Sequence, residues 1–405
     1  MDEPRTRLRP LASHPHRLAQ QAAAIVLYAW LMRWRPRPFL RWAGQFDHIL
    51  HAGTGARQIC CFGVNPHVVW EMTSRCNLQC IHCHAFGGVE SPTELTTAEG
   101  KAVIDQVAAS AIRTFVFSGG EPLLREDLFE LIAYAHARRL KVFLATNGTL
   151  ITEEVAKRLN QFKVGVVIGL DGMSPATHDA IRGVHGAYDA VMAGIANCVA
   201  EGLYLHLNIV ASRRNIGEIE RLLGYGARLG IYSYFIYLFV PLGRGEQVRD
   251  DALDSRERAA LLELLLLKQR EMNAILIPVA MPEYWAYALH QRGIRHGRLI
   301  RLVGQFLGGC LAGKGMVYLK PNGDVWPCPF LPIPAGNMRH EPLHRIVDRL
   351  VTSTVHGAQG DRNCTRCAYT PVCGGCKARL MIETRYRAEM HGESSVCPEY
   401  QRRGF

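Results

Sequence analysis

Three cysteines lie close together in the first quarter of the chain, in the sequence Cys76-Asn-Leu-Gln-Cys80-Ile-His-Cys83. Three thiolates within eight residues can hold three corners of one iron–sulfur cube when a loop leaving a strand carries them. The fourth iron then has no protein ligand, as a substrate-binding cluster requires, whereas an electron-transfer cluster would use a fourth cysteine. The spacing therefore predicts an iron–sulfur cluster with one open iron.

Zinc is the structural alternative for this loop, because closed zinc sites also use cysteine ligands. Such sites need four ligands, and the loop offers three thiols, with His82 and His84 as possible additions. We favour the iron–sulfur cluster, and we interpret His82 as a residue that packs within the cluster loop.

A second group of cysteines occupies the last 96 residues of the 405-residue chain. It comprises Cys310, Cys328, Cys364, Cys367, Cys373, Cys376 and Cys397. A hairpin is predicted between the first two, with a strand at 316–319 and a turn at 321–324, so these two cysteines are expected to meet. Seven thiolates exceed one four-ligand site, and a pair of zinc ribbons is the alternative to iron–sulfur clusters. We expect Cys60, Cys61 and Cys198 to be buried structural thiols.

Strand and helix patterns alternate between these two groups of cysteines. Strands are predicted at 67–73, 113–118, 141–146, 163–170, 203–210 and 232–240, and helices at 96–110, 127–138, 152–160, 187–201 and 215–229. This alternation requires parallel strands with right-handed crossovers. The fold class is therefore α/β, a partial (β/α)6 TIM-like barrel followed by a small cysteine-rich iron–sulfur domain.

The residues best suited to chemistry follow the predicted strands, at the barrel end where active sites lie. The three cysteines follow the first strand, Ser118-Gly-Gly-Glu-Pro122 the second, Thr146-Asn-Gly148 the third and Asp171-Gly172 the fourth. Gly119 and Gly120 allow the backbone to approach a ligand, and Glu121 is an acceptor for an ammonium group. The alternative is an ordinary strand-to-helix turn in which Pro122 begins the helix.

Together these motifs resemble those of radical S-adenosylmethionine enzymes, and the carboxyl-terminal part resembles the SPASM extension of that superfamily. The resemblance also includes Thr177-His-Asp179, Ile181-Arg-Gly183 and Asn215, and covers roughly 66–240 and 310–400. It implies that Cys76, Cys80 and Cys83 hold a [4Fe-4S] cluster that reductively cleaves S-adenosylmethionine. The products would be methionine and a 5'-deoxyadenosyl radical, which abstracts a substrate hydrogen.

The resemblance also implies which residues bind S-adenosylmethionine and which cysteines hold the auxiliary clusters. Gly119, Gly120 and Glu121 would bind the methionine end of S-adenosylmethionine, with Asn147, Asp171 and Asn208 as further cofactor-binding residues. Cys364, Cys367, Cys373 and Cys397 would hold one auxiliary [4Fe-4S] cluster, and Cys310, Cys328 and Cys376 a second one, whose fourth ligand is open. Gly169 departs from the pattern, because relatives often have a serine there that contacts the cofactor. A low-potential electron donor such as ferredoxin or flavodoxin is implied as a partner.

We divide the chain into a basic amino-terminal segment (1–65), a radical SAM barrel (66–241), a helical insert (242–309) and a SPASM domain (310–405). Nine Lys/Arg against three Asp/Glu in the first 60 residues make that segment basic. Its apolar run at 18–32 is too short to span a membrane and lacks a signal-peptide cleavage pattern, so a cytoplasmic protein is expected. Peripheral membrane contact through this segment is an alternative to packing on the protein itself.

Two substrate classes remain open on the sequence. Maturation of a peptide or protein comes first, and modification of porphyrin side chains, such as oxidative decarboxylation, comes second. The second is supported by Cys-Gly-Gly-Cys-Lys-Ala-Arg379 and by arginines every third residue from Arg292 to Arg301, which a helix would align to bind carboxylates. A non-enzymatic iron–sulfur protein is a distant third, and no pattern typical of nucleic-acid binding occurs.

Overall fold

The computed structural model describes residues 67–89, 93–110, 112–295, 297–304, 309–310, 312–313, 315–352 and 367–382. It also describes the backbone of two short paired strands, β1 (Ile59–Cys60) and β2 (Gly63–Val64). The predictions for the segment 1–58 and for Cys61, Cys364 and Cys397 lie outside the described residues.

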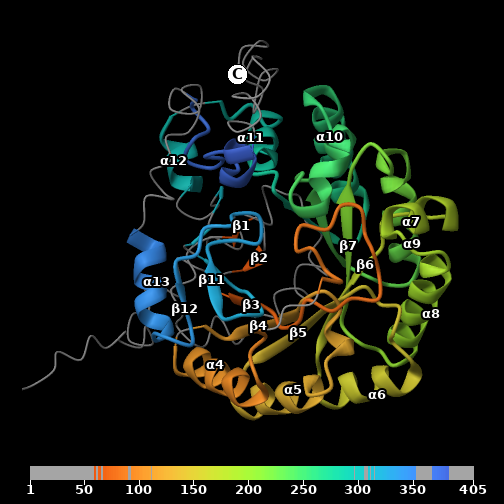
Figure 1. Cartoon of the computed structure of the whole chain (residues 1–405). Helices are drawn as coiled ribbons and strands as arrows, with labels where there is room; N and C mark the ends of the chain where they lie inside the picture. The colour runs from red at the N-terminus through yellow and green to blue at the C-terminus, as the bar shows by residue number, and fades with distance from the viewer. Residues whose placement is uncertain are drawn as a thin grey trace, which may run out of the picture.

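A sheet of ten strands forms the centre of the described part of the chain (Figure 1). All six strands predicted from the sequence belong to it and lie side by side in chain order, each parallel to the next. They are β3 (His67–Glu71), β4 (Thr114–Ser118), β5 (Lys141–Thr146), β6 (Gly165–Gly169), β7 (Leu205–Ala211) and β8 (Ser233–Leu238). The α/β partial barrel is confirmed.

Two further parallel strands extend this barrel beyond the six that the sequence predicts. β9 (Ile275–Val279) pairs with β8, and β10 (Met316–Leu319) pairs with β3. All five residues of β9 are buried, so its sequence lacks the alternation that marks a half-exposed strand. The predicted hairpin is confirmed by the antiparallel pairing of β10 with β11 (Asp324–Trp326), and β12 (Gly336–Asn337) continues that edge.

Helices cover the outer face of the sheet (Figure 1). The five predicted ones are confirmed as α4 (Thr97–Ala109), α5 (Leu128–Ala137), α6 (Glu153–Gln161), α8 (Ala187–Ala200) and α9 (Ile219–Arg228). α4 begins with a capping box between Thr96 and Glu99. An additional helix, α7 (Pro175–Arg182), begins at the Ser174 cap and ends at Gly183, whose φ of +72° suits a glycine.

The segment between β8 and β10 is not a simple helical linker. It contains the short 3-10 helix η4 (Gly243–Asp251), the predicted leucine-rich helix α10 (Ser255–Glu271), β9, α11 (Glu283–His290) and α12 (Arg298–Gly304). One helix carrying the arginines from Arg292 to Arg301 is therefore a wrong prediction. Gly293 and Gly297, with φ of +73° and +98°, separate α11 from α12.

The barrel core consists of side chains from the strands and the inner faces of the helices. Trp70 on β3 is fully buried against Phe115 and Phe117 of β4. Gly100 of α4 makes room for it, because a Cβ there would lie 2.6 Å from the Trp70 ring. α13 (Leu343–Thr352) lies near β12 (Figure 1). Within the described residues, no helix has the length and apolar character needed to cross a membrane.

Candidate functional site

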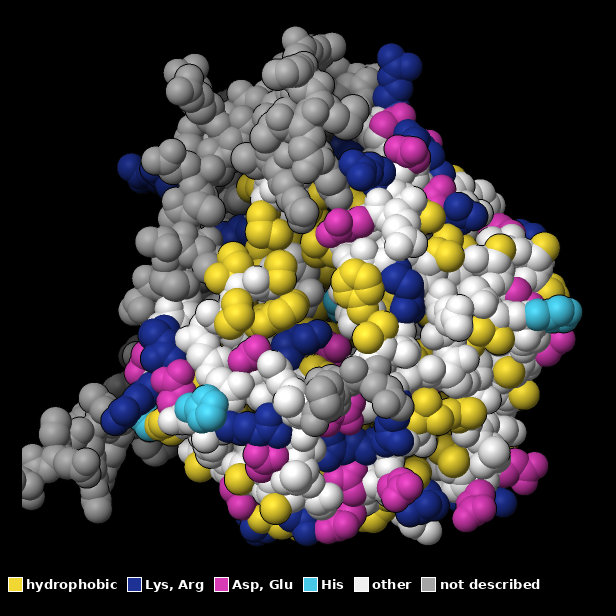
Figure 2. All heavy atoms as spheres, in the orientation of Figure 1, with side chains coloured by type: hydrophobic (Ala, Val, Ile, Leu, Met, Phe, Trp, Pro, Cys, Tyr) yellow, Lys and Arg dark blue, Asp and Glu magenta, His cyan; other side chains and the backbone are white. Residues whose placement is uncertain are grey.

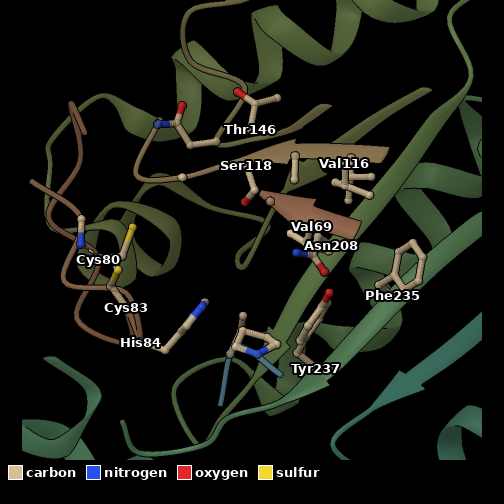
Figure 3. A pocket seen from close by; sticks show the side chains of 18 of the residues that line it. Val69, Cys80, Cys83, His84, Val116, Ser118, Thr146, Asn208, Phe235 and Tyr237 are labelled. Atoms are coloured by element: carbon tan, nitrogen blue, oxygen red, sulfur yellow. Dashed lines mark hydrogen bonds between the residues drawn. The ribbon is translucent and has the colours of Figure 1, made fainter. Parts of the chain in front are cut away.

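The loop after β3 brings Cys76, Cys80 and Cys83 together beside the barrel opening, and the sulfurs of Cys80 and Cys83 lie near each other (Figure 3). Each sulfur has a hydrogen-bond donor close by. The Leu78 amide donates to Cys76 Sγ at 3.4 Å, the Gly87 amide to Cys83 Sγ at 3.4 Å, and Arg182 Nη1 lies 3.9 Å from Cys80 Sγ. Such donors stabilise thiolates.

These thiols fit an iron–sulfur cluster better than a single metal ion. Burial, with smaller contributions from the neighbouring Cys80 and Glu121, raises the pKa of Cys76 to about 11. A cationic partner is therefore needed to hold the thiolate at neutral pH. No three His, Cys, Asp or Glu side chains among the described residues are arranged to hold one metal ion. A four-iron cube spreads its ligands apart, whereas a zinc site gathers them around one point.

Gly119 and Gly120 place the turn after β4 directly against the backbone that precedes this loop. A Cβ on Gly119 would lie 2.6 Å from the Thr73 carbonyl oxygen, and one on Gly120 would lie 2.2 Å from that of Arg75. The amides of Gly120 and Glu121 donate to these same two oxygens at 2.7 Å. Both glycines line the cavity described below, so the close approach lets the two chain segments form one wall.

Glu121 has a different environment from the one expected for an ammonium acceptor. Its carboxylate is fully buried and accepts hydrogen bonds from Thr146 Oγ1, the Asn147 amide and the Leu123 amide at 2.8, 2.8 and 3.1 Å. Burial raises its pKa to about 7. It is not among the residues that line the cavity, and it joins the end of β4 to the end of β5.

The three remaining cofactor-binding candidates from the sequence are Asn147, Asn208 and Asp171, and they differ in whether they line the cavity. Asn147 and Asn208 line the cavity, and Asn208 Oδ1 is buried without a hydrogen-bond partner. Asp171 is fully buried behind the wall, where it accepts from the Val210 amide at 2.7 Å and pairs with Arg182 Nη2 at 2.9 Å. Burial raises the pKa of Asp171, but nearby positive charge and hydrogen bonding, with the Arg182 guanidinium as the main contributor, together outweigh this effect and hold the pKa below its usual range.

Arg182 is a cavity residue that sequence reasoning did not single out, although it lies within the quoted Ile181-Arg-Gly183. It reaches from the end of α7 to the cavity between Asp171 and Cys80. A Cβ on Gly169 would lie 2.5 Å from Arg182 Nη2. The glycine that departs from the family pattern therefore makes room for a guanidinium that can bind an anionic group.

Arg244 of η4 is the second residue that the sequence did not reveal. Its Nε donates to the Cys80 carbonyl at 3.0 Å, its Nη1 donates to the Gly87 carbonyl at 2.6 Å, and its amide donates to the Cys83 carbonyl at 3.0 Å. It also lines the cavity. Three hydrogen bonds from one residue fix the path of the cysteine loop.

A cavity of about 300 Å³ connects the cysteine loop with the barrel interior and with the carboxyl-terminal hairpin. Val69, Val116, Phe235 and Tyr237 from the strands face this space (Figure 3). The carboxyl-terminal part of the chain contributes Met316, Tyr318, Pro329 and Phe330 to its lining. Figure 2 shows hydrophobic side chains gathered beside a hollow on one face of the molecule.

A second group of thiols lies on the hairpin side of this cavity. Burial raises the pKa of Cys328, and the proximity of Cys310 and Cys376 raises it further. A Cβ on Gly309 would meet the Cys373 carbonyl, so the Cys310 segment packs against Cys373. Cys310, Cys328 and Cys376 are thus neighbours. Cys198, by contrast, is a buried core residue of α8, and nothing but burial raises the pKa of its thiol.

Two known protein families match this chain, one over the first group of cysteines and the other over most of the second. Residues 70–225 match the Radical SAM superfamily, and residues 310–377 match SPASM, an iron-sulfur cluster-binding domain. The chain belongs to the radical SAM superfamily and carries a SPASM domain.

Several curated relatives cover most of the chain. An AdoMet-dependent heme synthase of Methanosarcina barkeri is 33% identical over 78% of this chain and 92% of its own length. An Fe-coproporphyrin III synthase of the same organism is 32% identical over 79% and 85%. Mycofactocin maturase MftC of Mycobacterium tuberculosis is 31% identical over 77% and 78%.

Solved structures share the fold at lower identity. Streptococcus suis SuiB bound to S-adenosylmethionine has a TM-score of 0.64 and 18% identity, covering 83% of this chain and 78% of that one. The anSMEcpe structure with bound AdoMet has a TM-score of 0.59 and 19% identity, covering 77% and 89%.

Proposed function

We propose that this protein is a radical S-adenosylmethionine enzyme that oxidatively decarboxylates a side chain of a tetrapyrrole. The observation that carries the enzymatic part is the cavity, which is lined both by the three cysteines of the barrel loop and by Tyr318, which lies near Cys328. A substrate in it would lie close to both groups of cysteines. The tetrapyrrole part is supported by relatives at 32 to 33% identity that are named for heme or Fe-coproporphyrin III synthesis.

The residues of the chain would bind, orient and shield the reactants. When bound, the clusters and S-adenosylmethionine would supply the radical that takes a hydrogen atom and the acceptor for one electron, with a donor such as ferredoxin or flavodoxin providing reducing electrons. Arg182 would bind a carboxylate next to the cysteine loop. Valines of β3, β4 and β6 would exclude water from the reacting carbon. Overall, a propionate loses one hydrogen atom, carbon dioxide and one electron, and becomes a vinyl group.

Maturation of a peptide or protein is the second candidate. It is favoured by the 31% identity with mycofactocin maturase MftC and was the first choice from the sequence. We rank it second because the tetrapyrrole synthases match over a larger share of their own length. A non-enzymatic iron–sulfur protein would have no need of an apolar cavity beside the cysteine loop.

The two candidates can be separated with anaerobically reconstituted protein, S-adenosylmethionine and a strong reductant. Fe-coproporphyrin III should be converted to a product lighter by carbon dioxide and two hydrogens, detected by mass spectrometry, while 5'-deoxyadenosine forms. A mycofactocin-type precursor peptide serves as the alternative substrate. Turnover of the peptide with an unchanged porphyrin would overturn the proposal.

A further inference from the structure

The barrel cavity is also lined by an imidazole, His206, one ring nitrogen of which has no hydrogen-bond partner. His206 and Asn208 of β7 both line the cavity, and residues two apart on a strand face the same side. Asn208 is level with Gly169 of β6, because the two are register partners. His206 therefore lies about 7 Å deeper in the barrel than these two residues.

His206 is held through only one of its ring nitrogens. Nδ1 lies 2.7 Å from the buried Ser233 hydroxyl, whereas Nε2 is buried and has no hydrogen-bond partner. His206 is 1% exposed. An unpaired buried polar atom costs free energy, and a ligand that pairs with it recovers that cost.

The surroundings of His206 keep the ring neutral. The rings of Tyr204, Phe235 and Phe143 lie 4.5, 5.3 and 5.7 Å away, measured between centroids. Burial, with a smaller contribution from the positive charge of Lys141, lowers the pKa of His206 to about 3. A neutral imidazole has a single N–H, and when the Ser233 hydroxyl donates to Nδ1 this hydrogen is on Nε2. In that tautomer Nε2–H is a hydrogen-bond donor that lies among aromatic side chains.

The charges that line the cavity favour an anionic occupant. Arg182 and Arg244 line it near the cysteine loop, and no Asp or Glu is present among the described residues of its lining. An aliphatic arm that ends in a carboxylate matches both the valines of the strands that line the cavity and the unpaired Nε2 of His206.

We propose that His206 Nε2–H binds the terminal carboxylate of a substrate side chain that enters the barrel. This inference rests on the proposed function, in which the arm is a propionate of a tetrapyrrole. His206 would be a specificity-determining residue, because it fixes how deep the arm reaches and thereby which carbon lies level with Gly169 and Asn208.

Binding of Fe-coproporphyrin III tests this directly, since the absorption of the porphyrin reports binding without turnover. Reconstituted protein with S-adenosylmethionine and no reductant is titrated with the porphyrin and with its tetramethyl ester. We expect wild-type protein to prefer the acid. His206→Phe should weaken binding of the acid at least tenfold and reduce the preference over the ester, and His206→Gln, which keeps an N–H donor, should recover most of the affinity.

Phe143→Leu is the matched control, because it alters the same wall without removing a polar group, and it should keep the preference for the acid. Iron content and thermal unfolding establish that each variant is folded, and His206→Leu replaces His206→Phe if the latter fails to hold its iron. Unchanged affinity and acid preference in a folded variant would overturn the role of His206 and leave the proposed function standing. Wild-type protein that binds no tetrapyrrole would overturn both.

Discussion

Gly169 and Arg182 share one small space beside the cysteine loop. The guanidinium occupies the volume that a side chain at position 169 would need, with a Cβ only 2.5 Å from Nη2. In this place it pairs with Asp171 and approaches Cys80 Sγ. A buried arginine whose partner carboxylate is fully buried is costly to displace, because the remaining charge would be left unpaired. Gly169 thus contributes to the binding site because it leaves room for Arg182.

Gly169→Ser should therefore destabilise the protein. The serine would push Arg182 from Asp171, and overpacking of this kind costs about 1 to 3 kcal/mol of unfolding free energy. Denaturant unfolding of the cluster-free protein measures the loss, and equilibrium dialysis should reveal weaker binding of S-adenosylmethionine by the reconstituted protein. Gly217→Ser is the control, because that glycine is exposed with nothing within 4 Å of a Cβ. Equal unfolding free energies for the two variants would contradict the interpretation.

The strands, helices and loops that carry the site differ in how well they can be predicted from the sequence. The six strands of the barrel alternate with amphipathic helices, and the cysteines have diagnostic spacing, so both could be predicted. β9 is buried on both faces and has no periodicity, and the pairing of β10 with β3 joins residues about 250 apart, which no local pattern encodes. Arg182 and Arg244 were missed for a similar reason, because only the folded chain brings them to the cysteine loop.

η4 acts on the cysteine loop through Arg244. Arg244→Gln should remove the hydrogen bonds to the Cys80 and Gly87 carbonyls, so the loop would hold its cluster less tightly. We expect iron of the first cluster to be lost several-fold faster to a chelator, followed by the decay of its visible absorption under anaerobic conditions.

Arg214→Gln is the matched control for this prediction. Arg214 is an exposed arginine that pairs with Asp251 at the end of η4 and is not part of the cavity lining. Its loss should leave the rate of iron release unchanged. Equal rates in the two variants would show that Arg244 does not hold the loop.

At the scale of the whole molecule, one sheet joins the two groups of cysteines. β3, which leads into the first group, pairs directly with β10, which lies between Cys310 and Cys328. Tyr318 of β10 lines the cavity, donates to the buried Glu71 of β3 at 2.9 Å, and lies near both Cys83 and Cys328. The two cysteine sites are therefore parts of one rigid assembly around the cavity, although the family matches treat them as separate segments.

The iron content should reflect three clusters. We expect anaerobically reconstituted protein to bind about twelve irons, four for each cluster. Replacing Cys76, Cys80 and Cys83 together by alanine should remove about four irons and abolish cleavage of S-adenosylmethionine. Iron and sulfide analysis provides the measurement, and stoichiometric zinc with little sulfide would refute the assignment.

The last prediction separates the auxiliary site from the first cluster. Cys376 is buried beside Cys310 and Cys328, and it is not among the residues that line the cavity with Cys76. Cys376→Ala should therefore spare the cluster of the barrel, and formation of 5'-deoxyadenosine without substrate should persist, because that step needs only the barrel cluster, its cofactor and a reductant.

Turnover of the true substrate should be lost if the auxiliary cluster receives the electron that leaves with carbon dioxide. If the cluster served only to stabilise a small domain, a variant that remains folded would still form product. Mass spectrometry of the product, measured alongside 5'-deoxyadenosine, distinguishes the two, and a folded Cys376→Ala protein with undiminished product would reject a role for this site in substrate chemistry.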